Sequence, residues 1–509
     1  MAHGRCDQQD NVPWSGPGGP TETLVADDLQ HAWLGPCHFG GLISGPYPDG
    51  RRVIWSNGRQ NIVKLDYETL EILADHEIVG GEGRTPRPEL EANLARLDEA
   101  EGWDAVEHAI ELSMRFMTGL DGVYALLDRD HTLFLGRHDH AVAYVETDPT
   151  DPGSPIVERD RWHKPAHIAG SFVGMNMTFD GRLVMSTDHG WVVVLARDFS
   201  TYDALQVAGG AEHAATYCAA MADAGRNGYG WMRTSICVDE ENGIYVSSND
   251  HHHKLRWTGE RLSDDEVDGC WTVPYRNGGG LGSGTTPSLM GFGPDEDRFV
   301  VIGDGDEVVN ITLLWRDEIP DDWEQLPNAP HRRIAGIGPA HMGDPGRAEI
   351  KTEQSITVSG YGAMTVNNEP ATVPDGFPAQ GVRMLCFMLG HKPEYTPHGM
   401  HKYEWDPVAR ELREAWVNLD ISSPNSVPFV AEENGLVYTC GVRDGKWTIE
   451  AADWATGESR FHLVLGGSQF NTLGAGVTID DDGRLLFGTM YGKTRILRDP
   501  APGRGAAVS

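Results

Sequence analysis

Several features that define other classes of protein are scarce or absent in this sequence. The first ten residues contain no apolar core like that of a secretory leader, and no apolar run reaches transmembrane length. The seven cysteines are widely spaced and form no Cys-x-x-Cys pair, which argues against a disulfide framework. These absences predict a cytoplasmic protein with free thiols and no association with a membrane.

Basic residues are also few. The chain has 41 Lys and Arg against 76 Asp and Glu, which gives a formal net charge of −35. Nucleic acids and anionic membranes bind to basic surfaces, so this balance excludes both as expected partners. The excess of carboxylates predicts a strongly solvated acidic surface. The oligomeric state leaves no trace in the sequence.

Glycine, in contrast, is abundant, with 62 residues in a chain of 509, and it belongs to a repeated pattern. Each unit has short apolar strands separated by turns rich in Asp, Asn and Gly. The clearest copies are residues 177–195 and 477–497, which both place Asp-Gly-Arg-Leu between their first two strands. With six looser copies, the pattern predicts an all-β chain, a single β-propeller of about eight four-stranded blades.

The predicted propeller spans residues 37–500, between an N-terminal segment 1–36 and a short tail 501–509. The last unit has only three strands. We therefore expect residues 21–25, which resemble a short strand, to complete the last blade and close the ring. Residues 88–119 follow a helical period, with Leu90, Leu94 and Leu97 on one face. They predict a helical insertion packed against the rim, with a mobile lid or a dimer contact as alternatives.

The turns before the outermost strands resemble those of quinoprotein-type propellers, whose repeats contain Ala-x-Asp-x-x-Thr-Gly. Residues 451–458, Ala-Ala-Asp-Trp-Ala-Thr-Gly-Glu, match well, and residues 64–71 match in part. The resemblance is at the level of the fold and implies eight blades. It does not extend to the quinone cofactor, because quinoprotein dehydrogenases hold it with two adjacent cysteines and this chain has none.

One face of the predicted ring gathers histidine and aspartate. The turns between second and third strands contain Arg137-His138-Asp139-His140, Asp188-His189 and Asp250-His251. Imidazole and carboxylate groups bind transition metals and act as general acids and bases near neutral pH. We therefore expect His189 to be a catalytic base, and Asp188, Asp250 and His251 to be metal ligands. Alternatively, these residues are solvated or bond the turn backbone.

A second set of polar residues lies near the predicted starts of the innermost strands. His38 is the second candidate base, and Glu353 is a candidate ligand for a hard cation. The remaining members are candidates for orienting a substrate by hydrogen bonds: Asn176, Thr234, Thr286, Asn425 and Asn471. The alternative is that these side chains bond main-chain groups between blades.

These residues favour an enzyme that acts on a small organic substrate at the axial mouth. A hydrolase or lyase reaction is expected, with calcium or zinc as the metal that could assist it. Two alternatives stay open, namely a non-catalytic protein-binding scaffold and a quinone-dependent oxidoreductase. A deep axial pocket with converging histidines and carboxylates would favour the enzyme, whereas a large exposed apolar or charged patch without such a pocket would favour the scaffold.

Overall fold

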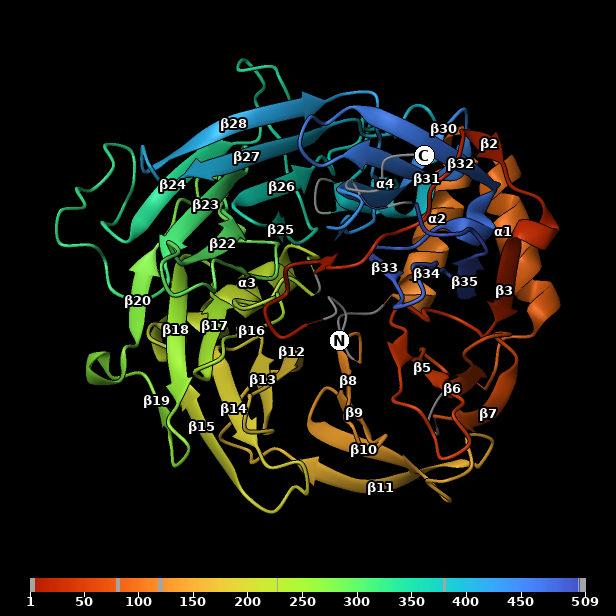
Figure 1. Cartoon of the computed structure of the whole chain (residues 1–509), viewed down its shortest axis with the longest axis horizontal. Coiled ribbons are helices and arrows are strands. Elements are labelled where there is room, and N and C mark those ends of the chain that lie inside the picture. The colour runs from red at the N-terminus through yellow and green to blue at the C-terminus, as the bar shows by residue number, and fades with distance from the viewer. Residues whose placement is uncertain are drawn as a thin grey trace.

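The computed structural model describes residues 5–78, 83–117, 122–226, 228–378, 381–501 and 503. Eight antiparallel sheets stand radially around one axis (Figure 1), so the predicted eight-bladed propeller is confirmed. From the innermost strand outward, blade 1 consists of β4 (Leu42–Ile43), β5 (Val53–Asn57), β6 (Asn61–Asp66) and β7 (Ile72–Glu77), and blade 2 of β8 (Ala125–Leu127), β9 (Leu133–Gly136), β10 (His140–Glu146) and β11 (Ile156–His163). Blade 3 consists of β12 (Phe172–Met177), β13 (Leu183–Thr187), β14 (Trp191–Leu195) and β15 (Tyr202–Gln206). Blade 4 consists of β16 (Cys237–Val238), β17 (Gly243–Ser247), β18 (His251–Trp257), β19 (Leu262–Ser263) and β20 (Trp271–Pro274).

Blades 5 to 8 follow the same plan around the ring. Blade 5 consists of β21 (Ser288–Met290), β22 (Phe299–Gly303), β23 (Asn310–Trp315) and β24 (Ile334–Pro339), and blade 6 of β25 (Thr357–Ser359), β26 (Gly362–Val366), β27 (Met400–Asp406) and β28 (Glu411–Asn418). Blade 7 consists of β29 (Phe429–Ala431), β30 (Leu436–Arg443), β31 (Lys446–Asp453) and β32 (Ser459–Gly466). Blade 8 consists of β33 (Val477–Ile479), β34 (Leu485–Gly488), β35 (Gly492–Ile496) and the N-terminal strand β3 (Leu29–Trp33).

The turns that revealed the repeat have the geometry that their residues require. Gly181 and Gly483, in the two Asp-Gly-Arg-Leu turns, have φ of +89° and +77°, a region that glycine enters without strain. In the quinoprotein-like turn, Asp453 Oδ1 accepts hydrogen bonds from the N–H groups of Ala455 (2.9 Å) and Thr456 (3.0 Å). The matched residues therefore shape a turn, and the resemblance is confirmed as one of fold.

The ring is closed by an N-terminal strand, but by a different one from that predicted. Strand β3 pairs antiparallel with β35 and becomes the outermost strand of blade 8. Residues 21–25 instead contain β2 (Glu22–Thr23), which pairs parallel with β32 at the outer edge of blade 7. The β-branched residues of that segment made it the better strand by propensity. Pairing was decided by which part of the chain reaches the open edge.

The N-terminal segment also crosses the centre of the ring (Figure 1). Strand β1 (Asn11–Val12) pairs parallel with β29 inside blade 7. Backbone carbonyls of the preceding residues accept hydrogen bonds from the innermost strands of three other blades: Cys6 from Val238, Asp7 from Leu289 and Gln9 from Val358. We refer to residues 6–12 as the axial plug, because they bond the innermost strands of blades 4 to 7 to one another.

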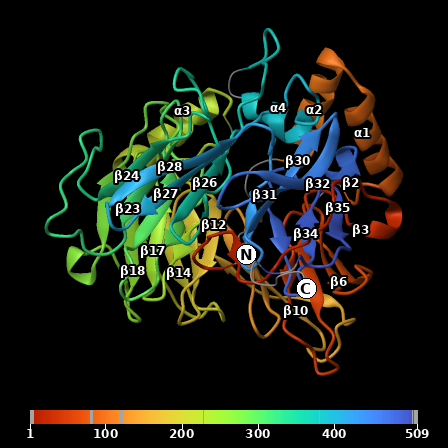
Figure 2. The ribbon, with the colours of Figure 1, turned by 45° about the horizontal axis from the view of Figure 1, so that its top comes forward.

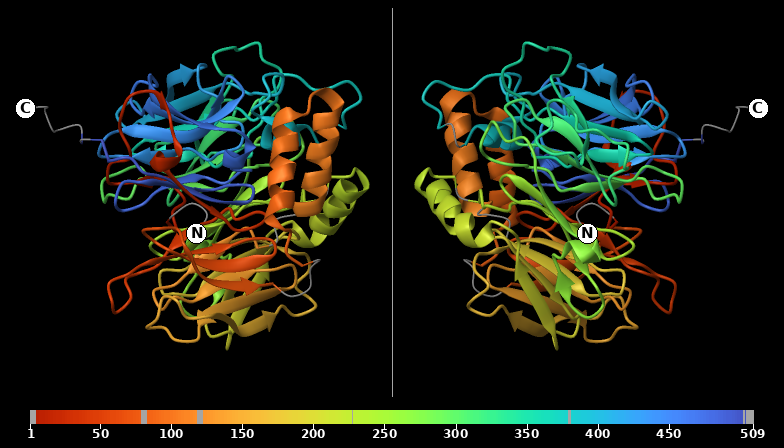
Figure 3. Two further views of the ribbon diagram at one scale, coloured as in Figure 1. Left: turned by 90° about the vertical axis from the view of Figure 1, so that its right-hand side faces the viewer. Right: turned by 90° about the vertical axis from the view of Figure 1, so that its left-hand side faces the viewer.

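Four helices gather on one face of the ring (Figures 2 and 3). They are α1 (Arg87–Glu99), α2 (Gly102–Phe116), α3 (Ala215–Asp223), which follows a short π-helix at Gly210–Ala214, and α4 (Val382–Leu389); short 3-10 turns lie at Ala26–Asp28, Glu266–Asp268 and Ser468–Phe470. Leu90, Leu94 and Leu97 of α1 are buried as their spacing predicted. Residues 118 and 119 of the predicted insertion, and most of the tail 501–509, lie outside the described residues. No helix in the described ranges is long and apolar enough to span a bilayer.

Candidate functional site: a roofed axial cavity

A cavity of about 810 Å³ lies on the axis, beneath the helices. Its floor and sides come from the loops that lead into the innermost strands, including Gly40, Tyr124, Thr286 and Gln354. The axial plug bonds the same strands further along their length, at Leu289 and Val358. The face where the innermost strands begin, which we call the upper face, therefore carries the cavity. The axial pocket that would separate the enzyme from the scaffold is present there, but no histidine is among its described lining residues.

The roof of the cavity is apolar and comes mainly from two helices. Helix α2 contributes Ile110, Met114 and Phe116, and helix α4 contributes Met384 and Phe387. The two helices contact one another, and their buried residues share one hydrophobic cluster with α1. The helical insertion thus builds the roof, and the exposed Met114 is an apolar side chain that a bound molecule could cover.

The lining of the cavity also contains one carboxylate between two guanidinium groups. Glu353 lies in the loop before β25, and its carboxylate forms an ion pair with Arg233, in the loop before β16. The other carboxylate oxygen is 2.8 Å from Nε of Arg383, at the start of α4. Arg233 and Arg383 lie 4.9 and 6.0 Å from the ring centre of Tyr229. All three charged side chains are largely buried.

This cluster is ionised. Burial opposes ionisation of the Glu353 carboxyl, but Arg233 and then Arg383 outweigh burial and hold its pKa below its usual range. The same carboxylate raises the pKa of Arg233 in spite of burial. One negative and two positive charges leave the cluster with an excess of one positive charge. A paired, low-pKa carboxylate is poorly suited to act as a general base.

The wider cavity wall is also basic, in contrast to the chain as a whole. Its described Arg, Lys, Asp and Glu residues are Arg59, Arg233, Arg383, Lys493 and Glu353. Burial lowers the pKa of Lys493 to about 7, but even without it three guanidinium groups face one carboxylate. The net charge of the chain is −35. A basic cavity inside an acidic protein favours an anion at that position over the surrounding solvent.

Of the residues predicted from the sequence, Thr286 and Glu353 line the cavity. Thr286 Oγ1 accepts a hydrogen bond from the N–H of Ser235 (3.3 Å). Thr234, also predicted to orient a substrate, is buried in the neighbouring loop and is not among the described lining residues. Glu353 has guanidinium partners, the opposite of the carboxylate-rich surroundings that a calcium ion needs.

Asn425 and Asn471 hold the roof. Their amide nitrogens both donate to the carbonyl of Phe387 in α4, at 2.9 Å each. Asn425 also donates to Asn471 Oδ1 (2.6 Å). Both side chains are fully buried, so they satisfy carbonyls near the C-terminal end of α4 and position the helix over the cavity.

His38, a predicted base, is locked inside blade 1. Its Nδ1 bonds Ser56 Oγ and its Nε2 bonds Asn61 Oδ1, both at 3.0 Å. The side chain has no exposed surface, and burial lowers its pKa to about 4. The geometry makes this histidine a bridge between strands β5 and β6, without access to the cavity.

Asn176 lies toward the opposite face from its predicted position. The innermost strand of blade 3 begins at Phe172, which pairs with Thr187 beside the predicted turn, whereas Asn176 pairs with Val184 near the other end of β13. Its amide donates to the carbonyls of Cys6 (3.0 Å) and Ile236 (2.7 Å). The prediction that Asn176 lies near the start of an innermost strand is therefore wrong, and Asn176 anchors the axial plug.

The predicted histidine turns do lie on the upper face. Ser171, just before β12, donates its N–H to Asp188 Oδ1 (2.8 Å), which also faces His189 Nδ1 (2.8 Å). In blade 4, Asp250 Oδ1 is 2.9 Å from His251 Nδ1. No histidine is among the described lining residues of the cavity. The roles of His189 as a base and of Asp188, Asp250 and His251 as metal ligands therefore gain no support from the cavity.

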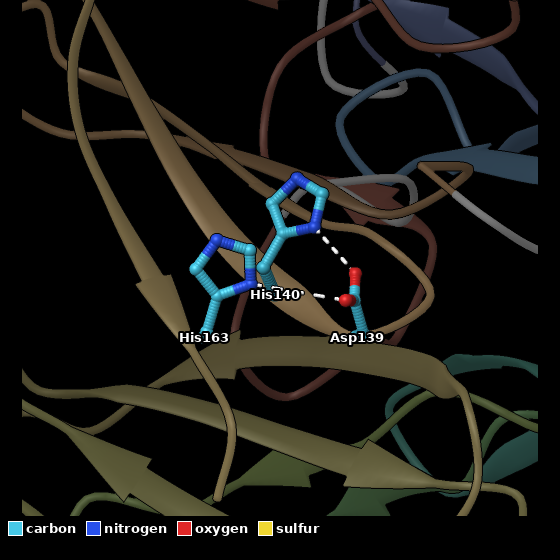
Figure 4. A group of neighbouring side chains, drawn as sticks. All are labelled: Asp139, His140 and His163. Atoms are coloured by element: carbon cyan, nitrogen blue, oxygen red, sulfur yellow. Dashed lines mark hydrogen bonds and ion pairs between the residues drawn. The ribbon is translucent and has the colours of Figure 1, made fainter.

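Two other groups combine three potential metal-ligating side chains within the described ranges. One is Asp139, His140 and His163 in blade 2 (Figure 4), and the other is His341, His401 and Glu414 in blades 5 and 6. The sequence had drawn attention to Asp139 and His140 through their turn. His163 was missed because it lies 23 residues after His140, at the end of a strand, and only pairing brings the two together.

Arg233 and Arg383 were also missed. Neither lies in a repeated turn, and Arg383 belongs to a helix inserted between β26 and β27. The one available signal was that Glu353 stands near the start of an innermost strand, where a buried carboxylate needs a cation as its partner.

Comparisons with known proteins leave the activity open. No family model matches the chain. An uncharacterized protein from Archaeoglobus fulgidus is 30% identical over 463 residues, which cover 89% of this chain and 79% of that protein.

Among solved structures, the chain is similar in fold to BamB from Moraxella catarrhalis (8% identity, TM-score 0.48, 94% of this chain and 99% of that one). It is also similar to virginiamycin B lyase from Staphylococcus aureus (8% identity, TM-score 0.40, 92% and 98%). The WD40 repeats of RRP9 give 8% identity and a TM-score of 0.40 over 94% and 99%. The assignment of the fold rests on the eight radial sheets of this chain.

Proposed function

We propose that this chain, which belongs to the same family as the Archaeoglobus fulgidus protein, binds a small organic anion with an apolar body in the axial cavity. The volume of about 810 Å³ is in the range of small-molecule sites, roughly 300–1,000 Å³. The apolar roof suits the body of such a ligand. The guanidinium groups of Arg233 and Arg383 suit a carboxylate or sulfonate, which accepts two hydrogen bonds from a planar fork.

One observation carries the proposal. Arg383 Nε lies 2.8 Å from Glu353 Oε1, but the two groups are not aligned, and neither atom has a hydrogen-bond partner among the described residues. Arg383 Nε is therefore paired by charge but donates no hydrogen bond, and a buried donor without an acceptor is costly. An anionic ligand would supply the missing acceptor to Arg383, whereas Glu353 would keep its ion pair with Arg233.

The proposal concerns binding. Neither His38 nor His189, the two histidines predicted as bases, lines the cavity, so the predicted hydrolase or lyase activity has no assigned base. The adjacent cysteines that hold the quinone in quinoprotein dehydrogenases are absent from the sequence, so the chain lacks the residues that would hold that cofactor. The cavity favours a small-molecule ligand over the protein-binding scaffold.

The test compares two fluorescent probes with a similar apolar body, the anionic 1-anilinonaphthalene-8-sulfonate and the neutral N-phenyl-1-naphthylamine. We expect the anionic probe to bind more tightly. Arg383→Met should weaken the anionic probe about tenfold, equivalent to about 1.4 kcal/mol, and leave the neutral probe nearly unchanged. Glu353→Gln should strengthen anion binding, because it removes the competing negative charge.

The exposed Arg413, on the outer strand of blade 6, pairs with Asp406 and Glu411 and gives the matched control. Arg413→Met also removes one positive charge and should leave both probes unaffected. Equal binding of the two probes, or an equal loss in Arg383→Met and Arg413→Met, would mean that the cavity does not select anions.

We also infer a reducing compartment, as expected of a cytoplasmic protein. All seven cysteines are free, and five of them are buried. Burial raises the pKa of the Cys37 thiol, which lines the cavity, to about 12. Such a thiol is protonated and unreactive at neutral pH.

A further inference from the structure

Three consecutive blades carry the same Asp-His pair in the turn before their third strand. The carboxylate faces Nδ1 of the following histidine in Asp139-His140 (2.7 Å), Asp188-His189 (2.8 Å) and Asp250-His251 (2.9 Å). Because the repeat reproduces the pair in each blade, the pair by itself is a feature of the turn. Any additional role must come from what differs between the blades.

Blade 2 differs by a third side chain at the same place. His163, at the end of β11, is the direct cross-strand partner of His140 at the start of β10. Its Nδ1 is 3.7 Å from the second oxygen of Asp139, and the two imidazole ring centres are 5.4 Å apart. Figure 4 shows the Asp139 carboxylate facing both rings. The three ligand atoms lie within 4.8 Å of one another.

The backbone fixes this arrangement. The N–H of Lys164 donates to the carbonyl of Asp139 (3.1 Å), so the end of β11 is tied to the turn. The ammonium group of Lys164 donates to the carbonyl of Ile168 (2.7 Å). The side chains of Asp139 and His163 are 59% and 63% exposed, so a cation and its water ligands can reach them from solvent.

We propose that Asp139, His140 and His163 form a binding site for a divalent transition-metal ion of the zinc class. Two imidazole nitrogens and one carboxylate oxygen are a common protein ligand set for Zn²⁺, with water as the fourth ligand. The proton on His140 Nδ1 transfers through solvent to Nε2 when the metal takes the Nδ1 lone pair, so the ring stays neutral. The site lies outside the axial cavity and does not depend on the anion proposed there.

The second group of three is less suited to a metal. The N–H of Gly343 donates to His341 Nδ1 (3.1 Å), which places the ring proton of His341 on Nε2. That nitrogen is the one that faces Glu414, at 3.7 Å. A metal at Nε2 would move the proton to Nδ1 and against the Gly343 N–H.

The test is calorimetric titration of the metal-free, full-length protein with Zn²⁺. We expect one site that His163→Ala weakens at least about tenfold, since even the second-shell partners of metal ligands are worth that much. His140→Ala should have the same effect. His251→Ala is the matched control, because it removes the histidine of a pair that lacks a third ligand, and it should keep the wild-type affinity.

Thermal unfolding supplies an independent readout. Zn²⁺ should raise the melting temperature of the wild type and of His251→Ala but not that of His163→Ala, because only a ligand that binds the folded state stabilises it. Because His163 is exposed, its variant should fold. The proposal is overturned if His163→Ala binds Zn²⁺ like the wild type, or if all three variants lose affinity equally.

Discussion

Lys493 is a cation without a counterion. Its side chain has no exposed surface and forms no ion pair among the described residues. Its Nζ donates to the carbonyls of Gly40 (2.8 Å) and His38 (3.5 Å), in the loop that leads into blade 1. Lys493 therefore joins blade 8 to blade 1 at the seam where the ring closes, and burial lowers the pKa of its amine to about 7.

This pKa makes stability depend on pH in a defined direction. The unfolded chain keeps the amine protonated up to its ordinary pKa of 10.5, whereas the folded chain loses the proton near pH 7. Between these values the unfolded state binds more protons, so the free energy of unfolding rises with pH from 7 to 10.5. Below pH 7 the amine is charged in both states, and its burial destabilises the folded state to the full extent.

Lys493→Met removes this titration. We expect the variant to gain stability relative to the wild type at pH 6, by on the order of a few kcal/mol, and the difference to shrink as pH rises toward 10. Denaturant unfolding at a series of pH values measures the difference between the two proteins and cancels the other titrating groups. A difference in stability between the two proteins that stays constant with pH would show that folding does not lower the pKa of Lys493.

At the scale of elements, the sequence correctly predicted the turns, strands and helix that are determined by residues close together in the chain. Asp-Gly turns and apolar strands were enough to count eight blades, and the Leu90, Leu94 and Leu97 spacing located a helix. The closing strand and the depth of Asn176 along β12 were wrong because both depend on pairing between distant segments. The axial plug was missed because it lies outside the repeat: its backbone carbonyls and the buried side chains of Gln9 and Asn11 bond strands far away in the sequence.

The cavity residues also divide into those that the repeat predicted and those that it did not. Glu353 and Thr286 could be placed on the correct face because they precede innermost strands in a repeated unit. The guanidinium groups that give Glu353 its chemistry come from a loop of blade 4 and from an inserted helix. A repeat predicts where its own residues lie, but it carries no information about the insertions that cover them.

The plug gives a prediction at this scale. Deletion of residues 1–12 leaves β3 in place but removes the acceptors of the N–H groups of Val238, Leu289, Val358 and Val430. An unsatisfied buried group costs about 1–3 kcal/mol, and water that takes the place of the deleted residues recovers part of that cost. We expect a lower melting temperature with a single cooperative transition retained. Deletion of residues 1–4 alone, which keeps these bonds, is the control. An unchanged melting temperature after the longer deletion would show that the plug adds no stability.

At the scale of the whole molecule, opposite electrostatic effects compete. The seam between blades 8 and 1 contains ion pairs such as Arg52 with Asp481 (2.6 Å) and Arg484 with Glu68 (3.0 Å). Salt weakens such exposed pairs, each worth less than about 1 kcal/mol. The formal net charge of −35 acts in the other direction, because repulsion among carboxylates destabilises the folded state and salt screens it.

The net charge should decide the balance, because the acidic residues outnumber the basic residues available to pair with them, 76 to 41. Raising NaCl from about 0.1 M to about 1 M shortens the screening length from about 10 Å to about 3 Å. We therefore expect the melting temperature to rise by a few °C, in scanning calorimetry at neutral pH. Sucrose is the control, because it stabilises proteins by exclusion from their surface without screening charge. A variant with several surface Glu→Lys changes should gain less in melting temperature from NaCl than the wild type, and the same amount from sucrose. A melting temperature that falls with NaCl would show that the ion pairs of the blade seams outweigh the repulsion.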